Sequence, residues 1–221
     1  MNLTEAMKIR HSVRQYENKP LEAEVISALQ AEIADCNKES GLHIQLVTNE
    51  PKAFDGFMAH YGKFSGVKNY IALIGKKDSA LDEKCGYFGE RLVLKAQQLG
   101  LNTCWVAMTY SKIKTAFALD KGEKLCLVIA LGYGQTQGIP HKSKAISEVA
   151  RVDKKMTDWF KNGVEAALLA PTAMNQQKFL FSFDGGKVSA KAGIGFYAKV
   201  DLGIVKYHFE VGAGTENFEW A

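Results

Sequence analysis

The sequence predicts an α+β fold, on three observations. Apolar residues recur at helical spacing in some segments and at strand-like spacing in others, and the two kinds are mixed along the chain without strict βαβ alternation. The nearly continuous apolar run KLCLVIALGYG is typical of a strand that is covered on both faces. The turn Asp-Gly-Gly between FLFSF and KVSAK is typical of a β-hairpin.

The elements expected in the first part of the chain begin with two helices. Thr4 is a candidate N-cap for a short helix that ends near His11, and apolar residues at helical spacing predict a second helix over 22–37. The other expected elements are strands at 43–49 and 69–75, a long helix at 79–99 closed by Gly100, a short buried strand at 103–107 and the apolar strand at 124–134.

The last third is expected to hold a helix at 153–169 that stops before Pro171, the hairpin, and a final helix at 201–214. The segments FGERLVLKAQQLGLNTCWVA and LGIVKYHFEVGAGTENFEWA share an order of glycine, apolar helix, small residues, Asn, Trp and Ala. This order indicates a faint internal repeat, for which chance similarity between amphipathic helices is the alternative.

Composition excludes several classes of protein. With 221 residues, 47% of them hydrophobic and 24% charged, the chain is predicted to form one large globular domain or two small fused ones. The net charge of +4 is mild and both signs are interspersed, which argues against a nucleic-acid binder. No apolar run is long enough for a membrane span, and the N-terminus lacks a signal-peptide pattern. The scattered cysteines predict neither zinc nor disulfides, so we expect a cytoplasmic protein with reduced thiols.

Two basic clusters are candidate anion sites. In RHSVRQY, residues Arg10, Ser12 and Arg14 alternate, so on an extended backbone they point to the same side. Two guanidinium groups and a hydroxyl suit a phosphate, although two solvated arginines in a surface turn are the simpler reading. Lys142 and Lys144 repeat the spacing with the same alternative. GYGQTQG lacks the strand-then-helix context of a dinucleotide loop.

A third candidate is APTAMNQQKF, residues 170–179, a polar turn between a helical pattern and a strand-like one. Such a turn is most often a plain loop. With it, four motifs resemble the flavin-dependent nitroreductase family: RHSVRQY resembles its RRSxRxF signature, LGLNTCWVA its GLGTCW segment, VIALGYG with HKSKAISEVA its LGYP and RKPLEEV, and APTAMNQQKF its APSAxNxQPW. Together they touch nearly the whole chain.

The resemblance implies FMN, which that family binds non-covalently at a homodimer interface. Arg10, Ser12, Arg14, Lys142 and Lys144 would then receive the phosphate and ribityl chain, with His11 between them. The backbone of Val106, Ala107 and Met108 would run beside the flavin N5 and O4 edge, and Lys63 would reach the pyrimidine edge. Family members often carry Gly where this chain has Ala107 and Met108.

One departure from the family pattern suggests a fused arrangement. In ordinary members the APSAxNxQPW segment lies a few dozen residues after the N-terminal signature, whereas here DCNKESG stands in that place. We therefore expect an intramolecular pseudo-dimer with a first unit at 1–150 and a shortened second unit at 151–221. Pro171, Thr172, Ala173 and Asn175 would close one flavin site per chain, so the core fold needs no second chain, and further oligomerisation stays open.

The implied activity is transfer of hydride from NAD(P)H through flavin to a nitroaromatic or quinone-like acceptor. No side chain stands out as a required general acid or base, which is expected when a cofactor carries the chemistry. Two alternatives stay open: a non-catalytic flavin-binding protein on the same fold, and a flavin-independent protein whose basic clusters bind another anion.

Overall fold

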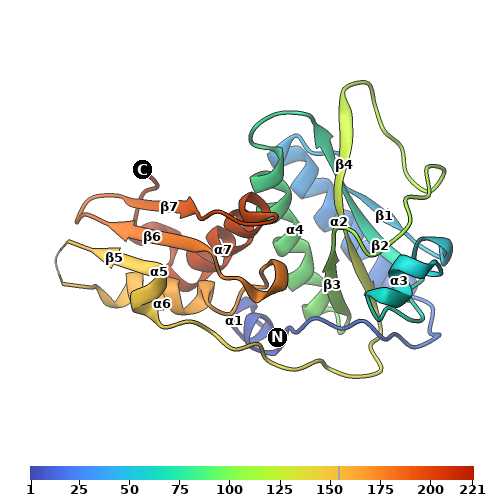
Figure 1. Ribbon diagram of the computed structural model, residues 1–221, viewed down its shortest axis with the longest axis horizontal. Helices are drawn as coiled ribbons and strands as arrows, with labels where there is room; N and C mark the ends of the chain where they lie inside the picture. Colours follow the sequence, from blue (N-terminus) through green and yellow to red (C-terminus); the bar gives the residue numbers. More distant parts are fainter. Residues whose placement is uncertain (154) are drawn as a thin grey trace. The chain divides into compact units, whose positions relative to one another are not determined.

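The computed structural model describes residues 1–153 and 155–221. The chain divides into two compact units, each assembled from separate stretches of sequence (Figure 1). The four-stranded unit comprises Ile9–Leu81 and Arg91–Pro140. The three-stranded unit comprises Met1–Lys8, Asp82–Glu90 and His141–Ala221.

The four-stranded unit is built on an antiparallel sheet in the order β1-β2-β4-β3 (Figure 1). Its strands are β1 (Gln45–Val47), β2 (Asn69–Lys76), β3 (Asn102–Val106) and β4 (Glu123–Gly132). From Leu127 to Gly132 every residue of β4 is buried, as its continuous apolar run predicts, and β2 is buried from Asn69 to Gly75. Both central strands are therefore covered on both faces.

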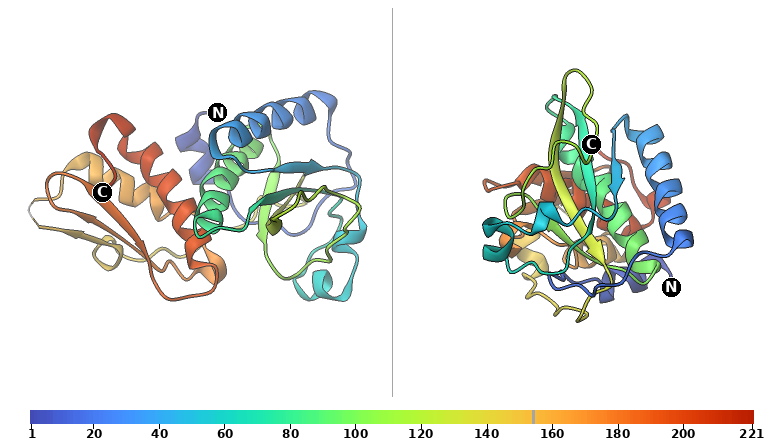
Figure 2. Two further views of the ribbon diagram at one scale, coloured as in Figure 1. Left: turned by 90° about the horizontal axis from the view of Figure 1, so that it is seen from above. Right: turned by 90° about the vertical axis from the view of Figure 1, so that its right-hand side faces the viewer.

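Helices and a loop layer cover this sheet. Helix α2 (Ala23–Ser40) lies alongside β1 (Figure 2) and buries Leu29, Ile33 and Cys36. It ends at Gly41, whose φ of 71° lets its N–H cap the carbonyl of Asn37. The short helix α3 (Phe57–Tyr61) and the turn η1 (Lys52–Phe54) belong to the same unit, and Phe54 and Ala59 pack into one core with alternate residues of β2, namely Tyr70, Ala72 and Ile74.

The three-stranded unit pairs β5 (Ala150–Val152) in parallel with β6 (Phe179–Phe183), and β6 antiparallel with β7 (Val188–Ala192). Helices α6 (Asp158–Ala167) and α7 (Ala198–Ala213) pack against each other. Stacked and edge-to-face rings fill the core between helices and strands, among them Phe160, Phe181 and Phe209, with Trp220 at the chain end. The helices α1 (Leu3–Ile9) and α5 (Ile146–Val149) complete the unit.

Two glycines allow a very close helix crossing in the three-stranded unit. Helix α4 (Leu81–Gln98) meets α7 where Gly86 and Gly203 face each other. A Cβ on Gly203 would lie 2.0 Å from the carbonyl oxygen of Glu83, and one on Gly86 would lie 2.0 Å from that of Val200. Backbone contacts backbone here, so only glycine fits at both positions.

The same helix pair buries an acid and a base together. His208 and Glu90 are both 0% exposed, and His208 Nε2 lies 2.8 Å from a Glu90 carboxylate oxygen. His208 Nδ1 donates to the carbonyl of Ala166 at 3.0 Å. Because that nitrogen carries a proton, the link from Nε2 to Glu90 must hold a second one, and the buried pair is neutral as a whole.

Most predicted elements are present, with some differences. The hairpin, the helix before Gly100 and the final helix are confirmed. The helix expected at 153–169 begins at Asp158 instead, because the backbone of the preceding Thr157 is extended (φ −80°, ψ 156°). The predicted position Lys154 lies outside the described residues. The pattern also missed α3, α5 and β5, which are too short for a periodicity to be visible. Among the described residues, no helix is long and apolar enough to cross a membrane.

Candidate functional site

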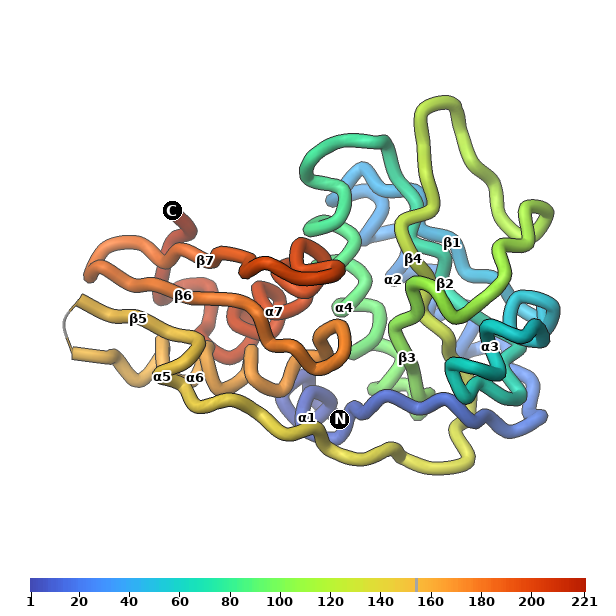
Figure 3. Tube along the Cα trace, in the orientation of Figure 1, coloured from blue at the N-terminus to red at the C-terminus, as the bar shows by residue number. Residues whose placement is uncertain are grey.

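The segment RHSVRQY lies along the edge of the four-stranded sheet and is joined to it by isolated bridges. Ser12 forms a parallel bridge with Thr103 of β3, and Val13 N–H donates to the carbonyl of Thr103 at 3.0 Å. Figure 3 shows this N-terminal segment passing the end of β3. Val13 and Tyr16 are buried in the core and anchor the segment on both sides of Arg14.

Arg10, Ser12 and Arg14 all act on one thiol. Burial raises the pKa of the Cys104 thiol, while the Arg14 guanidinium, a hydrogen bond with Ser12 and the Arg10 guanidinium each act to lower it. The two arginines differ in exposure, since Arg10 is 3% exposed and Arg14 lies open to solvent. Arg14 is therefore the guanidinium of this cluster that a dissolved anion meets first.

Lys63 belongs to a loop that lies against this segment. Ser65 N–H donates to the Arg14 carbonyl at 3.0 Å, and Tyr16 N–H donates to the Ser65 carbonyl at 3.0 Å. Gly66, with φ 71°, lies so near that a Cβ would stand 2.3 Å from the Tyr16 carbonyl oxygen. Lys63 is exposed and left-handed, with φ 61°. A non-glycine residue in this region of backbone space is uncommon and is often found at functional sites.

The loop after β3 completes this group. Val106 is buried at the end of the strand, Ala107 is half-buried and Met108 is 68% exposed. The next residue, Thr109, lies 2.7 Å from where a Cβ on Gly62 would stand, which brings the loop beside Lys63. Ala107 and Met108 N–H groups have no hydrogen-bond acceptor among the described residues. They are available as donors.

GYGQTQG supports the segment rather than forming a dinucleotide loop. Gly134 N–H donates to the side chain of Asn102 at 3.0 Å, and Asn102 donates to Gln137 at 3.0 Å. Gly138, with φ 71°, approaches His11 closely enough that a Cβ would stand 2.8 Å from the His11 Cβ. The two chain segments run side by side (Figure 3). His11 therefore packs against the GYGQTQG segment at Gly138.

The remaining predicted residues gather in the three-stranded unit. The turn η2 (Ala173–Asn175) carries left-handed backbone at Met174 and Asn175, with φ of 51° and 52°. Asn175 Nδ2 donates to the Lys142 carbonyl at 2.9 Å. Lys144 donates through its N–H to the Gln177 side chain at 2.9 Å and through Nζ to the Gln177 carbonyl at 3.0 Å. The structure therefore joins Lys142 and Lys144 directly to the APTAMNQQ turn.

One residue outside the motif that holds this turn was missed from the sequence. Asp201, on α7, accepts from Ala173 N–H at 2.9 Å and from Gln176 Nε2 at 2.7 Å. Gln176 Nε2 also donates to the Phe196 carbonyl at 2.8 Å. Burial raises the pKa of Asp201 to about 6, against the lowering effect of those two hydrogen bonds. No motif contains Asp201, and α7 carries other charged residues such as Lys206 and Glu210, so no signal in the sequence singled it out.

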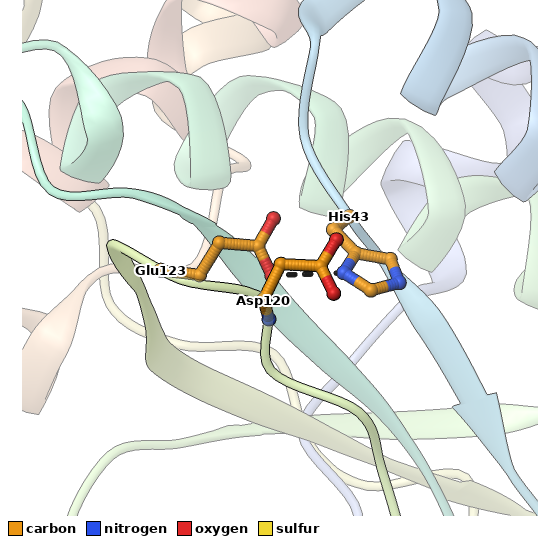
Figure 4. A group of neighbouring side chains, drawn as sticks. All are labelled: His43, Asp120 and Glu123. Atoms are coloured by element: carbon orange, nitrogen blue, oxygen red, sulfur yellow. Dashed lines mark hydrogen bonds and ion pairs between the residues drawn. The ribbon is translucent and has the colours of Figure 1, made fainter.

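A separate cluster in the four-stranded unit joins His43, Asp120 and Glu123 (Figure 4). One ligand atom from each lies within 4.8 Å of the others, which suits a metal ion. However, His43 Nδ1 and a Glu123 oxygen are already bonded at 2.9 Å, and the Asp120 N–H donates to the same oxygen at 2.8 Å. Burial acts to raise the pKa of Glu123, but these hydrogen bonds and the charges of His43 and Lys76 outweigh it, so the pKa is lowered overall. We interpret the cluster as a structural contact that joins the start of β4, at Glu123, to His43 just before β1.

Comparisons with known proteins show the family and the fold. A model of the family described as "Putative TM nitroreductase" matches residues 2–213. Among solved structures, a "putative nitroreductase (tm1586)" from Thermotoga maritima is similar at 23% identity and a TM-score of 0.65, covering 99% of this chain and 87% of its own. A nitroreductase family protein from Streptococcus pneumoniae is similar at 15% identity and a TM-score of 0.53, covering 67% of this chain and 98% of its own. At these identities the structures show a shared α+β fold. A search of curated proteins found no match.

Proposed function

The chain belongs to the family described as "Putative TM nitroreductase", and from that membership we propose that it is an FMN-dependent oxidoreductase. It passes hydride from NAD(P)H to a nitroaromatic or quinone-like acceptor. The observation that carries the proposal is the gathering of Arg10, Ser12 and Arg14 beside Lys63 and the loop after β3 within one unit.

The chemistry of these groups fits FMN. An exposed guanidinium, a hydroxyl and a second guanidinium suit a phosphate dianion, because charge-assisted hydrogen bonds to phosphate are among the strongest in proteins. The N–H groups of Ala107 and Met108 and the ammonium of Lys63 suit the polar edge of an isoalloxazine ring. The donor set thus offers two guanidinium groups and a hydroxyl for the phosphate end, and two backbone N–H groups and one ammonium for the ring end.

The residues of this chain bind and orient, and the bound flavin supplies the hydride chemistry. Arg14, which is open to solvent, would bind the phosphate together with Ser12 and Arg10. Lys63 and the N–H groups of Ala107 and Met108 stabilise negative charge on the pyrimidine side, where preorganised donors are most effective. The sequence offers no side chain that must move a proton.

We further propose that the turn carrying Pro171, Thr172, Ala173 and Asn175 completes the same flavin site, as the family resemblance implies, with Lys142 and Lys144 on its flank. The support is that the resemblance assigns all six residues to one cofactor and that hydrogen bonds join the turn to both lysines. The pseudo-dimer, with units at 1–150 and 151–221, is part of this proposal.

Flavin binding is tested first. Purified protein is examined for a visible flavin spectrum and then titrated with FMN and with riboflavin, following flavin fluorescence. We expect FMN to bind much more tightly than riboflavin. Arg14→Ala should weaken FMN binding about ten- to a hundredfold, from the loss of about 1.5–3 kcal/mol. Arg151→Ala, an exposed arginine outside the site, is the matched control. Equal affinity for FMN and riboflavin would remove the phosphate assignment.

Catalysis is tested separately. Steady oxidation of NAD(P)H that depends on a quinone or nitroaromatic separates an enzyme from a non-catalytic flavin protein. Because both substrates use one flavin face, double-reciprocal plots should give parallel lines. Intersecting lines across several acceptors would contradict a shared site, and FMN binding without turnover would favour the non-catalytic alternative.

A further inference from the structure

We propose that Asp201 is a positioning residue: its ionised carboxylate holds the turn 172–177 in the conformation that contacts the flavin. The inference rests on the proposed function for the identity of the ligand. The groups that carry it all belong to the three-stranded unit.

The turn needs an external holder because its backbone is unfavourable on its own. Met174, Asn175 and Gln177 have φ of 51°, 52° and 44°, and left-handed backbone costs a non-glycine residue free energy. Such a run persists only where surrounding bonds over-determine it. On one side Lys144 and the carbonyl of Lys142 bind the side chain of Gln177. On the other side Asp201 accepts hydrogen bonds from Ala173 and Gln176.

Asp201 holds the turn at two points. Oδ1 accepts from the N–H of Ala173 at 2.9 Å, and Oδ2 accepts from Gln176 Nε2 at 2.7 Å. The second proton on Gln176 Nε2 goes to the carbonyl of Phe196 at 2.8 Å. Gln176 therefore cannot turn its amide around without losing that bond. Two donors meet the carboxyl group, and only a carboxylate accepts with both oxygens.

A protonated Asp201 presents one acceptor and one donor, so its hydroxyl would face the N–H of Ala173 or the amide of Gln176, which is itself a donor. The charge is also costly: Asp201 is 3% exposed, and burial raises its pKa to about 6. From the packed turn, the groups that face the carboxylate are neutral, the N–H of Ala173 and the amide of Gln176. Among described residues no salt bridge offsets the charge, and the only two groups bonded to the carboxylate are neutral. A poorly compensated buried charge near a site is typical of a functional group.

Asp201→Asn is the direct test, since asparagine reproduces the single acceptor of the protonated acid. Asp184→Asn is the matched control: Asp184 accepts two backbone N–H bonds, from Gly186 at 2.8 Å and Lys187 at 3.1 Å, in the exposed hairpin turn. Gln176→Ala is the second variant, since it removes one donor and leaves the buried carboxylate in place. Circular dichroism verifies that each variant is folded.

The first readout needs no flavin. In wild-type protein the side-chain NH₂ protons of Gln176, assigned by their loss in Gln176→Ala, should shift in NMR spectra with a midpoint near pH 6. The shift should be absent in Asp201→Asn and retained in Asp184→Asn. Resonances that stay constant in wild-type protein between pH 4 and 8 would overturn the proposal.

The second readout is FMN affinity from pH 5 to 8. At pH 8 Asp201→Asn should bind FMN about tenfold more weakly than wild type, and Asp184→Asn should match wild type. A phosphate group itself gains a proton near pH 6, so the ratio of wild-type to Asp201→Asn affinity is the quantity of interest. That ratio should shrink below pH 6. Equal affinities at all pH values would overturn the positioning role while the proposed function stands. No FMN binding by wild type would overturn the proposed function and this inference together.

Discussion

Gly203→Ala tests how closely α4 and α7 must approach in the three-stranded unit. A Cβ at this position would stand 2.0 Å from the Glu83 carbonyl oxygen and 2.6 Å from the Tyr87 nitrogen. Ordinary carbon–oxygen contact begins at 3.4 Å, so the two helix backbones would have to separate by about 1.4 Å. Both clashing atoms belong to backbone, so no side-chain rotation can relieve them.

The net cost follows from two opposing effects. Overpacking of a well-packed interface costs about 1–3 kcal/mol, and a backbone clash of this depth lies at the upper end. Replacing Gly by Ala in a helix interior gains about 1 kcal/mol of helix propensity. We therefore expect Gly203→Ala to lower the free energy of unfolding by about 2 kcal/mol. Guanidinium chloride unfolding, followed by circular dichroism and by tryptophan fluorescence, measures this loss as a lower midpoint.

A double substitution sharpens the test. Gly86 occupies the same crossing, where its Cβ would lie 3.1 Å from the Gly203 Cα. Once the first alanine has separated the helices, the second should cost less, so the double variant should lose less than the sum of the single losses. Lys199→Ala, an exposed change on α7, should stay within about 0.5 kcal/mol of wild type. A Gly203→Ala protein as stable as wild type, or strictly additive losses, would refute the close crossing.

Three further predictions concern buried charge and stoichiometry. His208→Leu should lower the free energy of unfolding by about 3–5 kcal/mol, because it leaves the Glu90 carboxylate buried beside an apolar side chain. Adding Glu90→Leu should recover most of this loss. A loss below about 1 kcal/mol for His208→Leu would contradict the buried pair. As the pH rises from 4 to 6, the unfolding free energy of wild type should fall relative to that of Asp201→Asn, by at most about 3 kcal/mol. The reason is that Asp201 has a pKa of about 6 in the folded protein and 3.8 in the unfolded chain, so the folded protein binds the proton more tightly. Chemical-denaturation curves in which wild type gains stability relative to Asp201→Asn as the pH rises would contradict this sign. Titration should saturate at one FMN per chain, and saturation at two would contradict the single site.

Local features could be predicted from the sequence because they depend on neighbours along the chain. The run ending at Gly132 became the buried strand β4, since unbroken apolar residues favour a strand covered on both faces. The Asp184 turn became a hairpin, because its carboxylate accepts from the two following backbone N–H groups. Alternation predicted that Arg10, Ser12 and Arg14 share a side, and all three residues act on the pKa of the Cys104 thiol.

Alternation did not reveal that Arg10 is buried while Arg14 is open, because exposure depends on what packs against the segment. It also could not indicate which residues support the APTAMNQQ turn. Asp201 is 28 residues from Ala173, and Lys144 is 33 residues from Gln177.

His208 and Glu90 are 118 residues apart, and each looks unremarkable within its own helix. Periodicity and turn chemistry specify conformation over a few residues, so the sequence determined the elements and the composition of the candidate site. Which distant side chains meet is decided when helices and strands pack, because only the packed core fixes which polar groups lose water and must find a partner in each other.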